Sequence, residues 1–251
     1  MSTIAVTDHD TFAGVTRAKV FGERHGIEVI SGIEFSTIDS RRGRKAHILC
    51  YYCDNPDRLQ GICKRTGDNR RKAGNLMLQK TMRIYPIPAE MVLKLAQGST
   101  NLYKQHIMQA LIDAGYADCV FGQVFQRLFH PKTGLAYVAV EHPDVHEVIH
   151  AIHEAGGVAV LEHPSEYNSI DLMCELAQNK EIDGVEYWHP RNREEDLPLI
   201  QSVAEQYGLV MTGGTDFHGM YTKRPLPIGS YLTPDDQLAE LKKRKGHIQA
   251  G

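Results

Sequence analysis

Short apolar runs alternate with longer amphipathic stretches in the first fifty residues. Residues 4–6, 27–33 and 46–52 have the β-branched and aromatic content typical of strands. An amphipathic stretch from about residue 12 to 25 predicts a helix, and Gly26 is well placed to end it. Glu34 directly follows the second of these predicted strands.

The same alternation returns after residue 144. The pattern predicts helices at 144–155, 170–178 and 194–207, and strands at 158–161, 184–188 and 209–211. Strands separated by helices of this length are typical of βαβ units, and their nearly continuous apolar runs suit burial on both faces. We therefore expect a parallel sheet, either open or closed into a barrel.

Residues 56–135 have a different character. Strand patterns disappear, basic residues are common, and helical periodicity covers 59–82, 89–96, 103–114 and 120–129. The sequence thus predicts an α/β domain formed by residues 1–55 and 136–251, and an all-helical insertion, or cap, at 56–135.

Composition narrows the class of protein. The 251 residues are 42% hydrophobic and 24% charged, as in ordinary globular proteins, and a net charge of −3 gives no overall attraction to nucleic acid. Five cysteines without a repeating framework favour reduced thiols. No membrane-length apolar run or secretory signal is evident, so we expect a cytoplasmic protein with no membrane partner. The oligomeric state is not fixed by the sequence.

Potential metal ligands recur where the predicted strands end. Function gathers at the carboxyl ends of parallel strands, because the loops there open over a rigid base. Asp216 and His218 are two residues apart, so on an extended segment they point the same way. The full set is Asp8, His9, Glu34, His163, Asp216 and His218, with His47 inside a strand. This recurrence predicts a metal centre, and strand alternation turns Glu162 away from His163, towards the helices, so that Glu162 is not counted as a ligand.

A rim of imidazoles and carboxylates suits hydrolytic chemistry. Clustered divalent ions lower the pKa of a bridging water and neutralise the oxygens of a phosphate ester. A carboxylate that contacts two ions is an economical centre for such a site, and Glu34 is the natural choice. Mixed nitrogen and oxygen ligands suit zinc, manganese or iron alike, so the metal is left open.

Five motifs resemble the ordered motifs of the PHP (polymerase and histidinol phosphatase) family of metal-dependent phosphoesterases. They are TDHDT, GIEFST, HILCYY, AGGVAVLEHP and TGGTDFHG, and they span essentially the whole chain. The resemblance implies a distorted (β/α)₇ barrel with two or three divalent ions, such as Mn, Zn, Fe or Mg. It implies that Glu34 bridges the first two metals, that His47 and His163 complete the second, and that Asp216 binds the first. His9 and His218 would hold the third, and His9, Glu34 and Asp216 would be catalytic.

The resemblance also suggests substrate contacts. The segment YKQHIMQALIDAGY looks like the family's cap segment that places a basic residue and a histidine over the substrate phosphate, which makes Lys104 and His106 candidates. Arg191, in WHPRN, is a further candidate. For the basic residues, an ordinary surface salt bridge is the competing interpretation.

One departure from the family pattern lies at the start of the sequence. The family begins with a strand carrying His-x-His, whereas here the second family strand is already under way at Met1. Only the second metal site, formed by Glu34, His47 and His163, then has all its protein ligands. Either the sequence is a fragment or mis-assigned start of a longer enzyme, or it is a true product with weak or absent activity.

Three functions remain open on this basis. The first is a phosphoesterase that hydrolyses a phosphate monoester of a small nucleotide-like substrate through a metal-activated water. The second is a 5′-to-3′ exonuclease acting on the 5′ end of a short RNA or DNA. The third is a catalytically impaired remnant that lacks the first-strand ligands.

Overall fold

The computed structural model describes residues 1–219 and 226–247, with side chains up to residue 245. The chain forms two compact units. Unit 1 comprises Met1–Cys63, His142–Phe217 and the chain from Leu226 onward, and unit 2 comprises Lys64–Glu141 and the segment that starts at His218. The predicted boundaries, 56 and 135, thus lie six to eight residues before these divisions, and His218 is grouped with unit 2.

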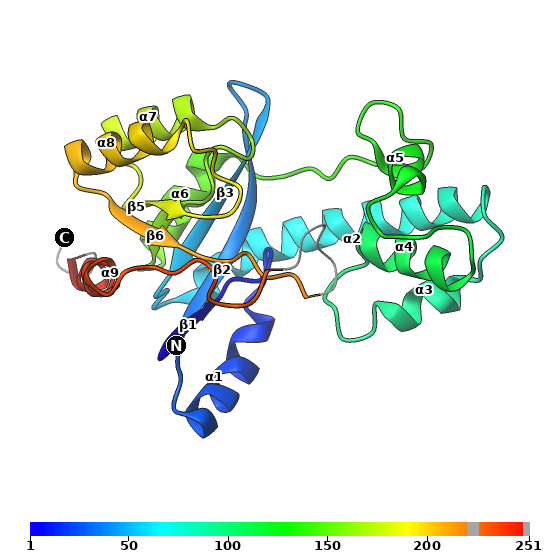
Figure 1. The fold of residues 1–251 in the computed structure, drawn as a ribbon, viewed down its shortest axis with the longest axis horizontal. Coiled ribbons are helices and arrows are strands. Elements are labelled where there is room, and N and C mark those ends of the chain that lie inside the picture. The colour runs from blue at the N-terminus through cyan, green and yellow to red at the C-terminus, as the bar shows by residue number, and fades with distance from the viewer. Residues whose placement is uncertain (220–225, 248–251) are drawn as a thin grey trace. The chain divides into compact units, whose positions relative to one another are not determined.

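Unit 1 is built on a six-stranded sheet in sequence order. Its strands are β1 (Thr3–Val6), β2 (Glu28–Asp39), β3 (Arg44–Tyr51), β4 (Val158–Leu161), β5 (Gly184–Trp188) and β6 (Val210–Gly213). β3 is antiparallel to both of its neighbours, and the other pairs are parallel. The parallel pairing expected for the strands after residue 144 holds for β4, β5 and β6. β3 runs antiparallel to β2 because the few residues between them allow only a hairpin, whereas a parallel crossover needs a dozen or more. Figure 1 shows the sheet curled into a half barrel.

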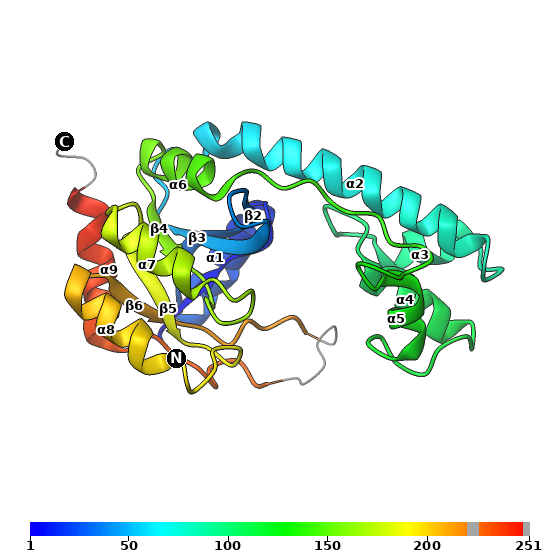
Figure 2. The same cartoon turned by 90° about the horizontal axis from the view of Figure 1, so that it is seen from above.

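The two faces of this sheet carry different side chains. On the outer face, alternate residues such as Phe35, Ile48 and Leu161 pack in one apolar core. Three helices cover it: α6 (Val145–Glu154), α7 (Ile170–Gln178) and α8 (Leu197–Tyr207). Figures 1 and 2 show α7 and α8 side by side over the sheet. Each helix buries an amphipathic stripe of the kind predicted from the sequence.

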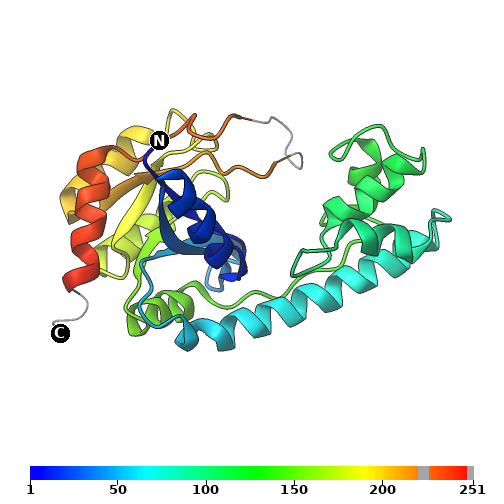
Figure 3. The ribbon, with the colours of Figure 1, turned by 90° about the horizontal axis from the view of Figure 1, so that it is seen from below.

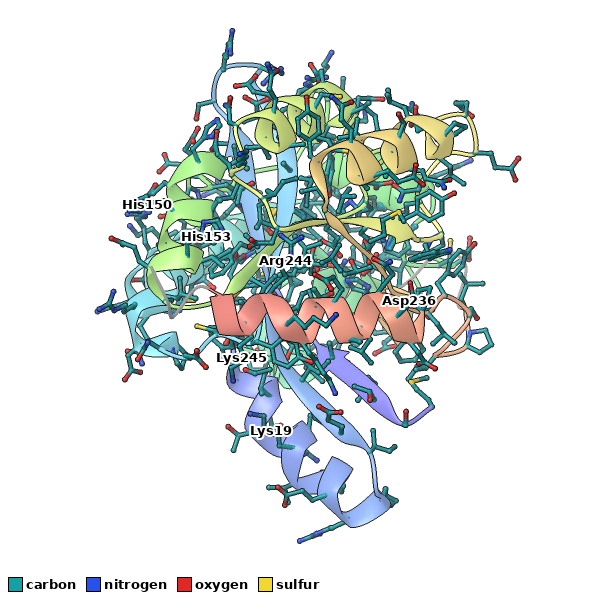
Figure 4. The ribbon with its side chains drawn as sticks, turned by 90° about the vertical axis from the view of Figure 1, so that its left-hand side faces the viewer. Lys19, His150, His153, Asp236, Arg244 and Lys245 are labelled. Atoms are coloured by element: carbon teal, nitrogen blue, oxygen red, sulfur yellow. The ribbon has the colours of Figure 1, made fainter. Side chains whose placement is uncertain are left out.

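The inner face has a smaller apolar core at one end. Leu49, Val160 and Val210 pack there against Leu241 of α9 (Asp235–His247). Figures 3 and 4 show α9 lying across this end, with Arg244 and Lys245 at its C-terminal half. Lys245 Nζ lies 3.1 Å from Asp54 Oδ1. The hydrophobic pattern predicts no element at α9, because its mainly charged sequence has a narrow apolar stripe.

The remaining helices agree closely with the predicted pattern. α1 (Ala13–His25) ends at Gly26, whose φ of 66° is the left-handed conformation that favours glycine. The 3₁₀ helix η1 (Pro56–Leu59) leads into α2 (Gln60–Met82), and unit 2 continues with α3 (Ala89–Leu95), α4 (Lys104–Asp113) and α5 (Gln123–Phe129). Unit 2 has its own apolar core. Among the described residues, no helix is both long and apolar enough to cross a bilayer.

Gly184 fixes the spacing between β5 and β6. A Cβ at this position would lie 2.6 Å from the carbonyl oxygen of Val210, the residue paired with it in the sheet. We expect Gly184→Ala to lower the free energy of unfolding by about 1–3 kcal/mol, because backbone atoms must move apart. The control is Gly61→Ala, whose Cβ meets no atom within 4 Å. Urea denaturation measures both, and equal stability of the two variants would contradict this account.

Candidate active site

Polar side chains occupy the end of the inner face opposite the α9 core. Glu34 shares its face of β2 with Ile30, His47 shares its face of β3 with Leu49, and Glu186 lies on β5. All three polar residues are buried. Glu34 lies within β2 and not at its end, because β2 runs on to Asp39. The interpretation of Glu34 as a residue that follows its strand is therefore wrong, although its side chain still reaches the rim.

Three histidines surround the Glu34 carboxylate. Nδ1 of His47 contacts Oε1 of Glu34, and Nδ1 of His9 lies 3.3 Å from the same oxygen. The His47 ring is 5.3 Å from the His9 ring and 5.1 Å from the His163 ring, between centroids. Tyr167 packs against His47 at 4.9 Å. Four predicted site residues, which come from distant parts of the sequence, are thus brought together around one carboxylate.

The Glu162 side chain points in a different direction from the one predicted from the sequence. The residue does not face the helices: Oε2 of Glu162 lies 3.4 Å from Nδ1 of His47 and 3.3 Å from Nε2 of His163. By the two-residue period, Glu162 shares the inner face with Val158 and Val160. The φ of His163 is 23°, which breaks the strand geometry directly after Glu162. Both side chains therefore reach the same site, and alternation could not be extended past the end of β4.

A second group lies around Asp216, which follows β6. Oδ2 of Asp216 is 3.8 Å from Nε2 of His189 and 3.0 Å from a terminal nitrogen of Arg191. Arg191 also lies 3.3 Å from Glu166. His189 was missed in the sequence, although the same signal was present: it directly follows β5, as His163 follows β4. The His163 and His189 rings are 5.0 Å apart, so the two groups adjoin.

The other predicted residues, Lys104, His106 and His218, belong to unit 2. His106 is buried in unit 2, where Nδ1 accepts a hydrogen bond from the backbone N–H of Tyr103 at 3.2 Å. The ammonium of Lys104 lies 4.8 Å from the centre of the Tyr137 ring. His218 follows the Asp216 loop and is grouped with unit 2. The roles of Lys104 and His106 in substrate binding, and of His218 as a metal ligand, stay predictions.

The residues around Glu34 and Asp216 fit divalent cations. Buried polar atoms without a hydrogen-bond partner include Nδ1 of His47, Oε2 of Glu162, Nδ1 of His163 and Nε2 of His189. Buried polar groups are normally satisfied, so such a convergence indicates that a partner is needed. One ligand atom from each of Glu34, His47, Glu162 and His163 lies within 4.8 Å of the others. The same holds for Glu162, His189 and Asp216.

The electrostatics of the cluster show a demand for positive charge. Burial lowers the pKa of His47, but the carboxylates of Glu34 and Glu162 outweigh it and raise this pKa to about 10. Burial raises the pKa of Glu162, whereas His163 and His47 hold it well below its usual range. Burial and the nearby Glu162 carboxylate raise the pKa of Glu186. Burial and the neighbouring His163 lower the pKa of His189 to about 3. In the metal-free protein, bound protons therefore supply part of the positive charge that bound cations would bring.

No family model matches the chain. The chain is 35% identical over 224 residues to the phosphoribosyl 1,2-cyclic phosphate 1,2-diphosphodiesterase of Eggerthella lenta, covering 88% of this chain and 85% of that one. It belongs to the PHP-type metal-dependent phosphoesterases. As a PHP-type protein it is an enzyme of phosphoester hydrolysis, as the motifs predict.

Other known proteins are similar to the chain at lower identity. It is 27% identical over 228 residues to the Escherichia coli 5′-3′ exoribonuclease Rnm, with 87% and 75% of the two chains covered. It is 25% identical over 227 residues to the Chromobacterium violaceum 3′,5′-nucleoside bisphosphate phosphatase, with 86% and 76% covered. A Bifidobacterium adolescentis structure, provisionally named a metal-dependent phosphoesterase, matches with a TM-score of 0.85 and 27% identity, covering 97% of this chain and 86% of that one. The predicted fold class is thereby confirmed.

Proposed function

We propose that this PHP-type enzyme hydrolyses a phosphate ester of a small, phosphorylated, nucleotide-like substrate at the cluster formed by Glu34, His47, Glu162 and His163. The convergence of buried, unpartnered ligand atoms in this cluster carries the proposal. Mixed imidazole and carboxylate ligands suit manganese, zinc or iron, and magnesium where oxygen ligands predominate. In this proposal, Glu34, His47 and His163 hold one divalent ion, as the family resemblance implies.

The protein groups around the cluster have distinct tasks in this proposal. When bound, divalent ions lower the pKa of a water molecule and neutralise phosphate oxygens. Glu34 positions His9 and His47 through the contacts of its Oε1. Tyr167 packs against the His47 and His163 rings and excludes water from that side. Arg191 brings a permanent positive charge beside Asp216, where a substrate phosphate can compete for it.

Two relatives support a small substrate that contains a ribose phosphate. The Eggerthella lenta relative is named for a phosphoribosyl cyclic phosphate, and the Chromobacterium violaceum relative for a nucleoside bisphosphate. A ribose-linked phosphate is common to both substrates. We therefore propose the same substrate class for this chain, which extends the monoester prediction to cyclic phosphates.

Hydrolysis of a defined substrate panel tests this proposal. The panel contains a ribose 1,2-cyclic phosphate, nucleoside 3′,5′-bisphosphates and nucleoside monophosphates, each with Mn²⁺ and after chelation. We expect metal-dependent hydrolysis of at least one ribose phosphate, measured as released phosphate or as ring opening by ³¹P NMR. Absence of turnover on every member, with metal bound, would contradict the proposal.

Exonuclease activity is the second candidate, favoured by the similarity to the 5′-3′ exoribonuclease Rnm. A 5′-phosphorylated oligoribonucleotide of about ten residues distinguishes the two. Stepwise release of mononucleotides from its 5′ end would support the exonuclease. An intact oligonucleotide beside hydrolysed ribose phosphates would support the first candidate.

We place either activity in the cytoplasm, because the cysteines among the described residues are all free.

A further inference from the structure

Glu162 occupies a central position in the active site. Only 5% of the surface of Glu162 is exposed, and its side chain lies at the end of β4 between two histidines. The neighbours along the same face, Val158 and Val160, are apolar and packed. A carboxylate at the end of this apolar row is costly to bury unless it is paired or binds a cation.

In the metal-free protein, nearby histidine rings meet this cost through their charge and not through hydrogen bonds. Oε2 of Glu162 approaches imidazole nitrogens at 3.3 and 3.4 Å but forms no hydrogen bond with acceptable geometry. One of those nitrogens, Nδ1 of His47, also lacks a hydrogen-bond partner. A purely structural glutamate would be expected to have donors arranged around it. Imidazole nitrogens and a carboxylate oxygen that converge without bonding one another are instead the components of a metal site.

Glu162 is also the residue common to both potential metal groups. One contains Glu34, His47 and His163, and the other contains His189 and Asp216. Without Glu162, the first group keeps three members, whereas the second has only two. His189, whose side chain is fully buried, also belongs to this group. Its Nδ1 accepts a hydrogen bond from the backbone N–H of Arg191 at 3.1 Å, so its Nε2 carries the ring proton and is not counted as a ligand atom.

We propose that Glu162 is a ligand shared by two divalent cations, one bound with Glu34, His47 and His163, the other with Asp216. This inference rests on the proposed metal-dependent function and adds one protein ligand to it, Glu162. It assigns to the carboxylate at the end of β4 a bridging role beside that of Glu34. Two carboxyl oxygens allow one side chain to serve two ions.

Metal stoichiometry of the whole chain tests this assignment without any activity measurement. Wild-type protein and Glu162→Gln are dialysed against the same Mn²⁺ concentrations, and bound manganese is measured by elemental analysis. We expect two ions per wild-type chain, and in Glu162→Gln the second ion bound at least about tenfold more weakly. Glu195→Gln is the control, because the Glu195 side chain is 75% exposed, and it should retain both ions.

Electron paramagnetic resonance of the Mn²⁺-loaded wild type gives a second readout that needs no variant to fold. Two ions that share a ligand give an exchange-coupled spectrum, whereas two separate ions give the six-line signal of isolated Mn²⁺. Two ions with no coupling, one ion per wild-type chain, or unchanged affinities in Glu162→Gln would each overturn the shared-ligand assignment. In these three cases hydrolysis by the wild type would leave the proposed function standing, whereas failure of that function would appear as no turnover by metal-loaded protein.

Discussion

Glu34→Gln is expected to release phosphate from a ribose phosphate substrate at least about a hundredfold more slowly than the wild type. Removal of residues that merely orient metal ligands typically lowers affinity or activity 10–100-fold, so loss of a central carboxylate should exceed that range. Glutamine keeps the size of the side chain but removes the charge beside His9 and His47. Initial rates at saturating Mn²⁺ and substrate measure the effect.

Two observations separate this effect from unfolding. The metal-free Glu34→Gln protein should keep the wild-type far-ultraviolet circular dichroism, since the apolar cores of unit 1 do not include Glu34. The variant Glu195→Gln removes an exposed charge and should hydrolyse substrate at the wild-type rate. If folded Glu34→Gln kept more than a tenth of the wild-type rate, this residue would not be central to the reaction.

Metal-free wild-type protein is expected to lose thermal stability as the pH rises from 6.5 towards 10. The pKa of His47 is about 10 in the folded protein, above its ordinary value of 6.5. The bound proton therefore stabilises the folded state fully below pH 6.5, and this contribution is lost as the pH rises through 10. We expect the melting temperature to fall by on the order of 5 °C or more over this range.

The variant His47→Asn isolates this contribution, because asparagine has no proton to lose in this range. Its melting temperature should change less between pH 6.5 and 10 than that of the metal-free wild type. The control His25→Asn, at an exposed histidine on α1, should follow the wild type. Parallel curves for His47→Asn and the wild type would show that the alkaline loss arises from other groups.

Local patterns predicted most elements of unit 1 well. The predicted bounds of β4, α7 and β5 coincide with those in the structure. These elements have continuous apolar runs or full amphipathic stripes. Such local patterns are enough to indicate a strand or a helix. The direction of β3 does not follow from its local pattern, because strand direction depends on pairing between distant segments. A connection too short for a crossover, at residues 40–43, was the available signal.

Part of the candidate site could be predicted from the rule that functional residues gather where parallel strands end. His163 and Asp216 follow the ends of parallel strands, and the structure brings both to the inner rim together with His47. His189 directly follows β5, so the same rule could have predicted it. Glu162 was assigned to the wrong face because the positive φ of His163 is a tertiary feature, which strand periodicity does not encode.

The central claim is that Glu34, His47 and His163 hold a divalent ion used for phosphoester hydrolysis. Anomalous diffraction from crystals of the active protein grown with Mn²⁺ tests it most directly. We predict a manganese peak within bonding distance of all three side chains. Crystals of protein that hydrolyses ribose phosphates, with manganese bound elsewhere and none among these three residues, would contradict the account.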